Sequence, residues 1–118
     1  MVVVGSTEAT EGTPTLGIYA ASKAAIHSLA RTWAAELVGR RIRVNTLVPG
    51  PTRTPGIEGL AASPAEVEGL VAQLAGQRAM GRMAHPAEIA NVALFLASDE
   101  SSCMTGSEVF ADGGVTLI

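Results

Sequence analysis

The sequence predicts an α/β fold in which about three parallel strands alternate with flanking helices. Three short runs, at residues 2–4, 42–48 and 106–111, are rich in apolar and β-branched side chains, and longer stretches with helical spacing separate them. Strands that alternate with helices predict a parallel sheet covered by helices on its faces. With 118 residues, the chain has room for one domain or for part of one.

The first strand and the longest helix are predicted from the first third of the chain. The valine run at 2–4 ends at Gly5 and is typical of a strand buried on both faces of a parallel sheet. Glycines and a proline then indicate a loop through Gly17. From 18 to about 38 apolar side chains recur at steps of three or four, which predicts a helix with Gly39 as its C-terminal cap.

A second face of this predicted helix carries only small side chains, which would let another helix or backbone approach closely: Ala21, Ala24, Ala25 and Ser28. The second strand is expected at 42–48 and should stop at Pro49, because proline cannot continue a hydrogen-bonded ladder.

The remaining elements follow from their start and stop signals. Ser63, Pro64 and Glu66 have the spacing of an N-cap, a first-turn proline and a third-position glutamate, so we expect a helix over 64–75. Pro86 opens another helix over 86–97. The last strand is predicted at 106–111, and Asp112 with the two glycines after it forms the turn that ends it.

Composition excludes several classes of protein. Eight Lys and Arg against eleven Asp and Glu give a net charge of −3, which offers no basic surface for nucleic acid. The densest apolar run, 89–97, is half the roughly 18 to 20 residues that a bilayer crossing requires. Cys103 is the only cysteine, so neither a disulfide framework nor a cysteine-based zinc site is expected. We therefore expect a cytoplasmic protein with no metal site and with neither nucleic acid nor a membrane as partner.

Tyr19 and Lys23 are the only tyrosine and the only lysine of the chain, and four residues separate them. On a helix this spacing places both side chains on one face, where an incidental surface pair is the alternative to a functional one. A phenol exchanges protons poorly at neutral pH unless its phenolate is stabilised, and a nearby ammonium does this. Ser6, at the end of the first strand, could hydrogen-bond the same substrate oxygen that Tyr19 protonates.

These three residues begin a series that resembles the C-terminal half of a short-chain dehydrogenase/reductase (SDR). The series continues in order and at familiar separations over the whole chain, through Arg43-Val44-Asn45, Pro49-Gly50, Thr54, Gly81-Arg82, Pro86-Ala87-Glu88-Ile89-Ala90, Phe95-Leu96-Ala97-Ser98-Asp99, Thr105-Gly106 and Asp112-Gly113-Gly114. The resemblance implies the C-terminal half of a Rossmann-type doubly wound parallel sheet. Residues 1–118 would then be a partial NAD(P)-binding domain that lacks the N-terminal dinucleotide-binding half.

The resemblance also implies a reaction, the interconversion of a secondary alcohol and a ketone by hydride transfer with NAD or NADP. In it Ser6 would orient the carbonyl or hydroxyl, Tyr19 would transfer the proton, and Lys23 would bind the nicotinamide ribose and tune Tyr19. The segment 55–83 would cover a small-molecule substrate, with an apolar lid built from Leu60, Val67, Leu70, Val71, Leu74 and Met80.

Further cofactor contacts are implied for the loop after the second strand. Pro49 and Gly50 would shape this loop against the nicotinamide, while the Thr52 backbone and the Thr54 hydroxyl would lie near its carboxamide. Together with Tyr19 and Lys23 they make up the expected cofactor-binding set, and the resemblance further implies a homodimer or homotetramer.

A Gly-rich turn between a first strand and a helix, which would meet the pyrophosphate of a dinucleotide, is missing from this sequence. Two hypotheses therefore stand side by side. The chain is the C-terminal half of an oxidoreductase and is inactive alone, or it is a truncated non-enzymatic module that associates with intact SDR subunits. An incomplete gene or an alternative start is a third reading.

Several other side chains are expected to have structural roles only. Arg40, Arg41 and Arg43 read as a solvated helix end whose charges complement the helix dipole. Cys103 is expected to be a small buried hydrophobe. We expect His27 and His85 to occupy packing or surface positions. Trp33 is expected in the core or at a subunit interface.

Overall fold

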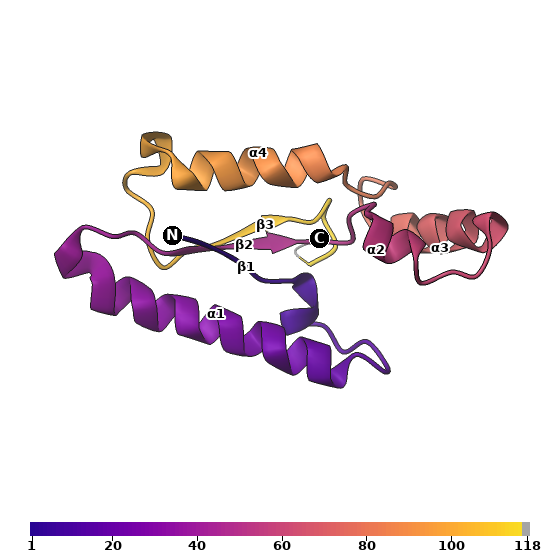
Figure 1. Ribbon diagram of the computed structural model, residues 1–118, viewed down its shortest axis with the longest axis horizontal. Helices are drawn as coiled ribbons and strands as arrows, with labels where there is room; N and C mark the ends of the chain where they lie inside the picture. The colour runs from indigo at the N-terminus through magenta and orange to yellow at the C-terminus, as the bar shows by residue number, and fades with distance from the viewer. Residues whose placement is uncertain (117–118) are drawn as a thin grey trace.

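The computed structural model describes residues 1–116. Its three strands, β1 (Val2–Val4), β2 (Asn45–Pro49) and β3 (Glu108–Ala111), form one parallel sheet in the order β1-β2-β3. Val4 pairs with Leu47, and Leu47 pairs with Val109. The α1 helix (Gly17–Leu37) covers one face of the sheet and α4 (Pro86–Ala97) covers the other, as Figure 1 shows. The predicted α/β fold with a parallel sheet is therefore confirmed.

Two further helices, α2 (Pro55–Glu58) and α3 (Pro64–Gly76), lie beyond the carboxyl ends of the strands (Figure 1). They extend the molecule to 52 Å along its longest axis, against 29 and 26 Å along the others. Three short 3-10 turns complete the described elements: Thr7–Ala9, Val38–Arg40 and Asp99–Ser101.

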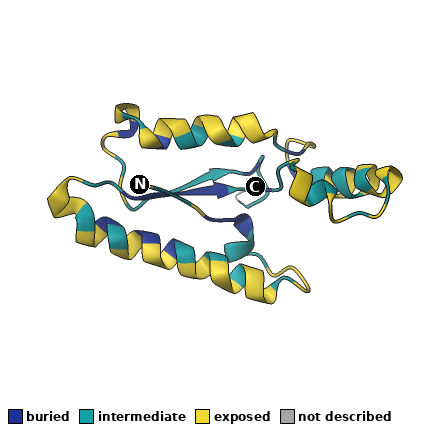
Figure 2. Ribbon diagram, viewed as in Figure 1, coloured by how far each residue is buried: buried dark blue, intermediate teal, exposed yellow. Residues whose placement is uncertain are grey.

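The core is centred on β2, the middle strand. Val48 of β2 and Val44, which immediately precedes the strand, are fully buried, and Leu47 is 1% exposed, because helices cover both faces of the sheet here. Ala30 and Ala34 of α1 pack against Val44 from one side, and Trp33, Leu37 and Ile42 are partly buried against the same cluster. Figure 2 shows this arrangement as buried and half-buried strands between helices whose outer faces are exposed. The core alternative for Trp33 is thus the one that the packing supports.

The prediction that β1 is buried on both faces is wrong. Val2 and Val3 are half-buried, and Val4 is 52% exposed. The reason lies in the sheet order, because β1 is an edge strand of the described sheet and has β2 as its single strand neighbour there.

The predicted starts of the two later helices are confirmed. At α3, the Ser63 hydroxyl accepts a hydrogen bond from the Glu66 amide at 3.3 Å. At α4 the N-cap is His85, for which the sequence analysis predicted only a packing or surface position. Its Nδ1 accepts from the Ala87 amide, while the Glu88 carboxylate accepts from the His85 amide, so the imidazole takes the role that a serine usually has.

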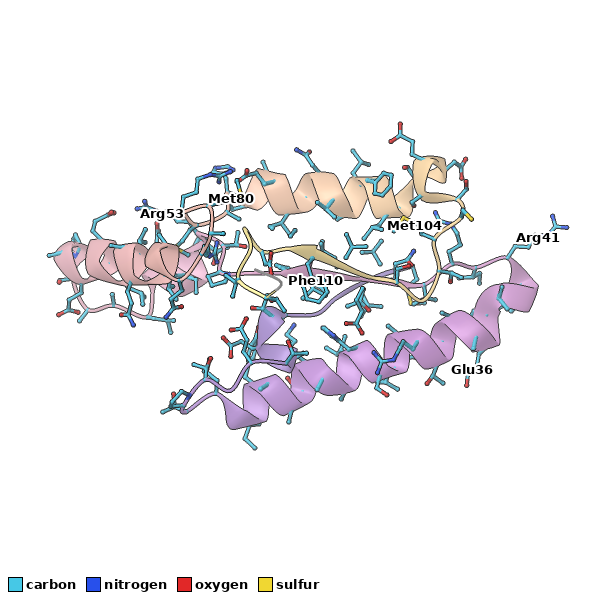
Figure 3. The ribbon with its side chains drawn as sticks, turned by 180° about the vertical axis from the view of Figure 1, so that it is seen from behind. Glu36, Arg41, Arg53, Met80, Met104 and Phe110 are labelled. Carbon is cyan, nitrogen blue, oxygen red and sulfur yellow. The ribbon has the colours of Figure 1, made fainter. Side chains whose placement is uncertain are left out.

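The predicted cap at Gly39 is wrong. After Leu37 the chain tightens into the 3-10 turn Val38–Arg40, and this shift moves the left-handed position to Arg41, at φ 57°. Arg40 and Arg41 are exposed as expected, and Figure 3 shows Arg41 projecting away from the end of α1.

Two other expectations fail because of tertiary contacts. The Arg43 side chain is not solvated, since its guanidinium donates five hydrogen bonds of 2.8 to 3.4 Å. One goes to the Leu96 carbonyl in the last turn of α4, and four go to the connection between α4 and β3, with acceptors on Ser98, Ser101 and Met104. Cys103 lies in that connection and is exposed, not buried. Within residues 1–116, no helix combines the length and apolar character needed to cross a membrane, and no cluster of three or more His, Cys, Asp or Glu could hold a metal ion.

Candidate active site

A cavity of about 760 Å³ opens at the carboxyl ends of β1 and β2. Every site residue predicted from the sequence lines it: Ser6, Tyr19, Lys23, Pro49, Gly50, Thr52 and Thr54. The carboxyl edge of a parallel sheet is the usual place for a ligand site in open α/β folds, because the loops that follow the strands converge there.

Ser6 follows β1 directly and begins the 3-10 turn Thr7–Ala9. Its hydroxyl oxygen accepts a hydrogen bond from the Glu8 amide at 3.2 Å, and the residue is 8% exposed. Because the oxygen is used as an acceptor, the O–H remains as a donor toward the cavity.

Tyr19 and Lys23 lie in the first turns of α1, on the side that faces this edge of the sheet. The ammonium nitrogen of Lys23 lies 5.6 Å from the centroid of the Tyr19 ring, and it donates a hydrogen bond to the Val4 carbonyl at 3.2 Å. Tyr19 is 45% exposed, so its phenol reaches the open part of the cavity.

The loop after β2 forms another wall of the cavity. Gly50 is required there, since a Cβ on it would lie 2.8 Å from the Asp112 Cα and 3.0 Å from the Asp112 carbonyl oxygen, which belong to the turn after β3. The Thr52 hydroxyl donates to the Gly50 carbonyl at 2.9 Å, and the Thr54 hydroxyl oxygen caps α2 at the Ile57 amide. Both threonines are thereby fixed at the rim of the cavity.

The opposite wall is apolar and comes from the helices beyond the sheet. Of the lid residues expected from the sequence, Leu60, Leu70 and Leu74 line the cavity, joined by Ile57 and by Ile89 of α4. Val67, Val71 and Met80 are not among the lining residues. Polar groups thus gather at the sheet edge and apolar ones face them, as in most small-molecule sites.

Sequence reasoning missed the partners of His27. This residue is 4% exposed and joins the Ser6 amide to the Glu108 carboxylate, which also accepts a hydrogen bond from Arg31. His27 lies four residues after Lys23, and that helical spacing was a signal for a shared face. Its partner on β3 is 81 positions away, and no local pattern predicts such a contact.

Arg78 and Asp112 line a second cavity, and Asp112 also packs against Gly50 of the loop after β2. Arg78 is 6% exposed, and burial lowers its pKa. Burial and the neighbouring Glu8 carboxylate raise the pKa of Glu11. Burial works against the Asp112 carboxylate, but hydrogen bonds from the amides of Gly114 and Thr116 outweigh it and lower the pKa of Asp112.

The sequence profile of the family described as enoyl-(acyl carrier protein) reductase matches residues 1–116. The chain belongs to the short-chain dehydrogenase/reductase family. It is 43% identical over 118 residues to the oxidoreductase asL5 of Sarocladium schorii and 42% identical over 117 residues to the 3-oxoacyl-[acyl-carrier-protein] reductase FabG of Thermotoga maritima.

Solved structures of SDR proteins confirm the Rossmann-type fold. The ligand-free aldohexose dehydrogenase of Thermoplasma acidophilum superimposes with a TM-score of 0.92 at 27% identity and is matched over 48% of its length by 99% of this chain. A short-chain dehydrogenase/reductase family protein gives a TM-score of 0.82 at 40% identity. The chain covers 45% of the length of the asL5 and FabG relatives while nearly all of its own residues are matched.

Proposed function

We propose that this chain is the catalytic part of an NAD(P)-dependent oxidoreductase that interconverts a secondary alcohol and a ketone. The observation that carries the proposal is the convergence of Ser6, Tyr19 and Lys23 on one cavity with an apolar opposite wall. Relatives whose names state a carbonyl or alcohol reaction, a 3-oxoacyl reductase and a diacetyl reductase among them, support it.

Each residue has a role that follows from its donor and acceptor groups. The Ser6 hydroxyl donates a hydrogen bond to the substrate oxygen, while the Tyr19 phenol gives that oxygen a proton during reduction and takes it back during oxidation. The Lys23 ammonium, held by the Val4 carbonyl, stabilises the phenolate that remains. The nicotinamide cofactor supplies or accepts the hydride when it is bound.

The donor set of the cavity fits the nicotinamide riboside half of such a cofactor. One of the three donors of the Lys23 ammonium is used by the Val4 carbonyl, and the others suit the hydroxyls of a ribose. Tyr19 lies beside it, and Pro49, Gly50, Thr52 and Thr54 provide a wall for the ring and its carboxamide. NAD and NADP carry this same half, so both remain candidates.

We also propose that residues 1–118 form only part of the NAD(P)-binding domain and that the dinucleotide-binding half lies outside them. The missing Gly-rich turn and the 45% coverage of the relatives support this division. Calorimetry should therefore detect weak or no binding of NADH or NADPH to the 118-residue chain, and micromolar affinity would contradict the division.

The catalytic proposal is tested by Tyr19→Phe. Because the chain alone lacks most of a dinucleotide site, the assay uses a chimera in which the unmatched part of the Thermotoga maritima FabG relative precedes Met1. We expect ketone reduction by this chimera, and a loss of kcat of about 10²-fold or more in the variant, as for removal of a general acid. Thr32→Ala, on the exposed side of α1, is the control. Unchanged turnover in Tyr19→Phe would overturn the proposal.

A second candidate function, a non-enzymatic module that associates with intact SDR subunits, is favoured by one observation. The small face of α1 is exposed, since all four of its residues are exposed to solvent: Ala21, Ala24, Ala25 and Ser28. Such a surface also suits a homodimer or homotetramer of a cytoplasmic enzyme, which we propose as the assembly and location. Co-expression with an intact relative followed by size-exclusion chromatography tests the module, and failure to co-migrate argues against it.

A further inference from the structure

We propose that His27 is a positioning residue that holds the backbone of Ser6 through a hydrogen-bond chain from Arg31 over Glu108. The inference rests on the proposed function, since it concerns the serine of that site. It is carried by contacts that join α1 and β3 to the end of β1.

The first step is the face of α1 on which His27 lies. Tyr19, Lys23 and His27 follow one another at intervals of four and so share one side of the helix. Lys23 donates to the Val4 carbonyl at 3.2 Å, and His27 Nε2 lies 3.4 Å from the Ser6 amide nitrogen. The helix that carries Tyr19 therefore holds the end of β1 at two points, one on each side of Gly5.

The second step is the protonation pattern of the imidazole. The Ser6 amide can only donate, so Nε2 must be the unprotonated acceptor. The proton of a neutral ring then lies on Nδ1, which is 3.1 Å from Oε2 of Glu108. The other carboxylate oxygen, Oε1, accepts from Arg31 at 2.5 Å. One tautomer of His27 thus satisfies both of its contacts, and Glu108 selects it.

The third step is the close packing of the imidazole against Gly5, which fixes the position of the ring. A Cβ on Gly5 would lie 2.1 Å from His27 Nε2 and 3.0 Å from the Thr46 side chain. The ring therefore rests directly on the backbone that precedes Ser6. Any tilt of the ring moves the acceptor of the Ser6 amide, and with it the direction of the hydroxyl that faces the cavity.

A matched pair of substitutions separates the two contacts of the imidazole. In His27→Gln the side-chain amide reaches the place of Nε2 and can accept from the Ser6 amide. In His27→Asn it reaches the place of Nδ1 and can only keep the contact with Glu108. The comparison therefore tests the link to Ser6 with two residues of the same chemistry, and Thr32→Ala on the exposed side of α1 is the control.

Two measurements follow the backbone of Ser6 without depending on turnover. Long-range ¹H–¹⁵N NMR spectra of the 118-residue chain, or of the chimera, should show His27 with its proton on Nδ1. Hydrogen exchange of the Ser6 amide should accelerate about tenfold in His27→Asn, as for one lost hydrogen bond, and stay near wild type in His27→Gln. A proton on Nε2, or equal exchange in the two variants, overturns the proposal. Equal acceleration at Leu47 in the core would mean global loosening and also counts against it.

Kinetics of the chimera separate this inference from the proposed function. We expect His27→Asn to lower kcat about tenfold with little change in KM, and His27→Gln to keep most of kcat. If Tyr19→Phe abolishes turnover while both His27 variants remain fully active, the positioning role fails and the catalytic proposal stands. If Tyr19→Phe has no effect, the catalytic proposal fails, and the NMR and exchange data still decide whether His27 holds Ser6.

Discussion

Arg43 offers the most direct test of what holds the sheet to its covering layers. It precedes β2, and its guanidinium reaches four backbone carbonyls and one hydroxyl, in the last turn of α4 and in the connection from α4 to β3. Arg43→Met keeps most of the aliphatic volume and removes every one of these donors. The carbonyls would then depend on water that must enter a half-buried region.

The size of the loss follows from the two shortest of these contacts, both 2.8 Å, to the carbonyls of Ser98 and Ser101. A hydrogen bond to a charged group contributes about 1.5 to 3 kcal/mol, and the five contacts are not additive. Counting only the two shortest, at the low end, gives about 3 kcal/mol for Arg43→Met. At about 4 °C per kcal/mol for a domain of this size, the melting temperature should fall by about 12 °C.

Urea denaturation followed by circular dichroism measures this difference, with Arg40→Met as the matched control. Arg40 is exposed, and its side chain makes no hydrogen bond within residues 1–116, so its replacement should change the free energy of unfolding by less than about 0.5 kcal/mol. Arg43→Lys should fall between the two, because an ammonium cannot reproduce the planar fork of donors. Equal stability of Arg43→Met and Arg40→Met would refute the reasoning.

Three further predictions concern the surroundings of the cavity. Gly50→Ala should destabilise the fold by about 1 to 3 kcal/mol in urea denaturation, because its Cβ meets the Asp112 backbone; a neutral result would mean that the loop shifts freely. Glu11→Gln should raise the melting temperature at pH 7, since the fold disfavours the charged carboxylate, and this gain should vanish below the ordinary pKa of 4.5; equal shifts at pH 7 and pH 3 would contradict it. Glu88→Gln should lower the melting temperature at pH 7. The hydrogen bonds from Arg82 and the His85 amide hold the pKa of Glu88 at about 2, so their stabilisation is present above pH 4.5 and is lost as the pH falls toward 2; a difference that persists at pH 2 would exclude this cause.

Much of the fold could be predicted because its signals are local. The valine run at 2–4 and the β-branched run before Pro49 predicted two strands, and the Ser63-to-Glu66 and Pro86 signals predicted the starts of α3 and α4 to the residue. The failures share a cause, since each depends on contacts distant in sequence. Arg43 bonds to residues 53 to 61 positions away, and the exposure of Val4 depends on which strands lie beside β1.

The candidate site divides in the same way. The four-residue interval between Tyr19 and Lys23 predicted that both lie on one helical face. The resemblance to the family predicted that Ser6 and the loop after β2 lie near them, and all of these residues line one cavity. The chemical roles of these residues stay predictions. His27 was missed because its partners, the Ser6 amide and Glu108, are brought together only by the packing of α1 against the sheet. A histidine has no fixed role until its neighbours are known.

The position of β1 in the sheet has a consequence for handling the chain in solution. Among residues 1–116 this strand hydrogen-bonds to β2 on one side. On its other side Lys23 occupies the Val4 carbonyl, and the remaining backbone groups have no strand neighbour, next to a valine that is 52% exposed. An apolar, uncovered edge of this kind is a template for strand addition between copies. Self-association of the isolated 118 residues at high concentration would then proceed through β1, independently of the small face of α1, and would be suppressed when another strand occupies that edge.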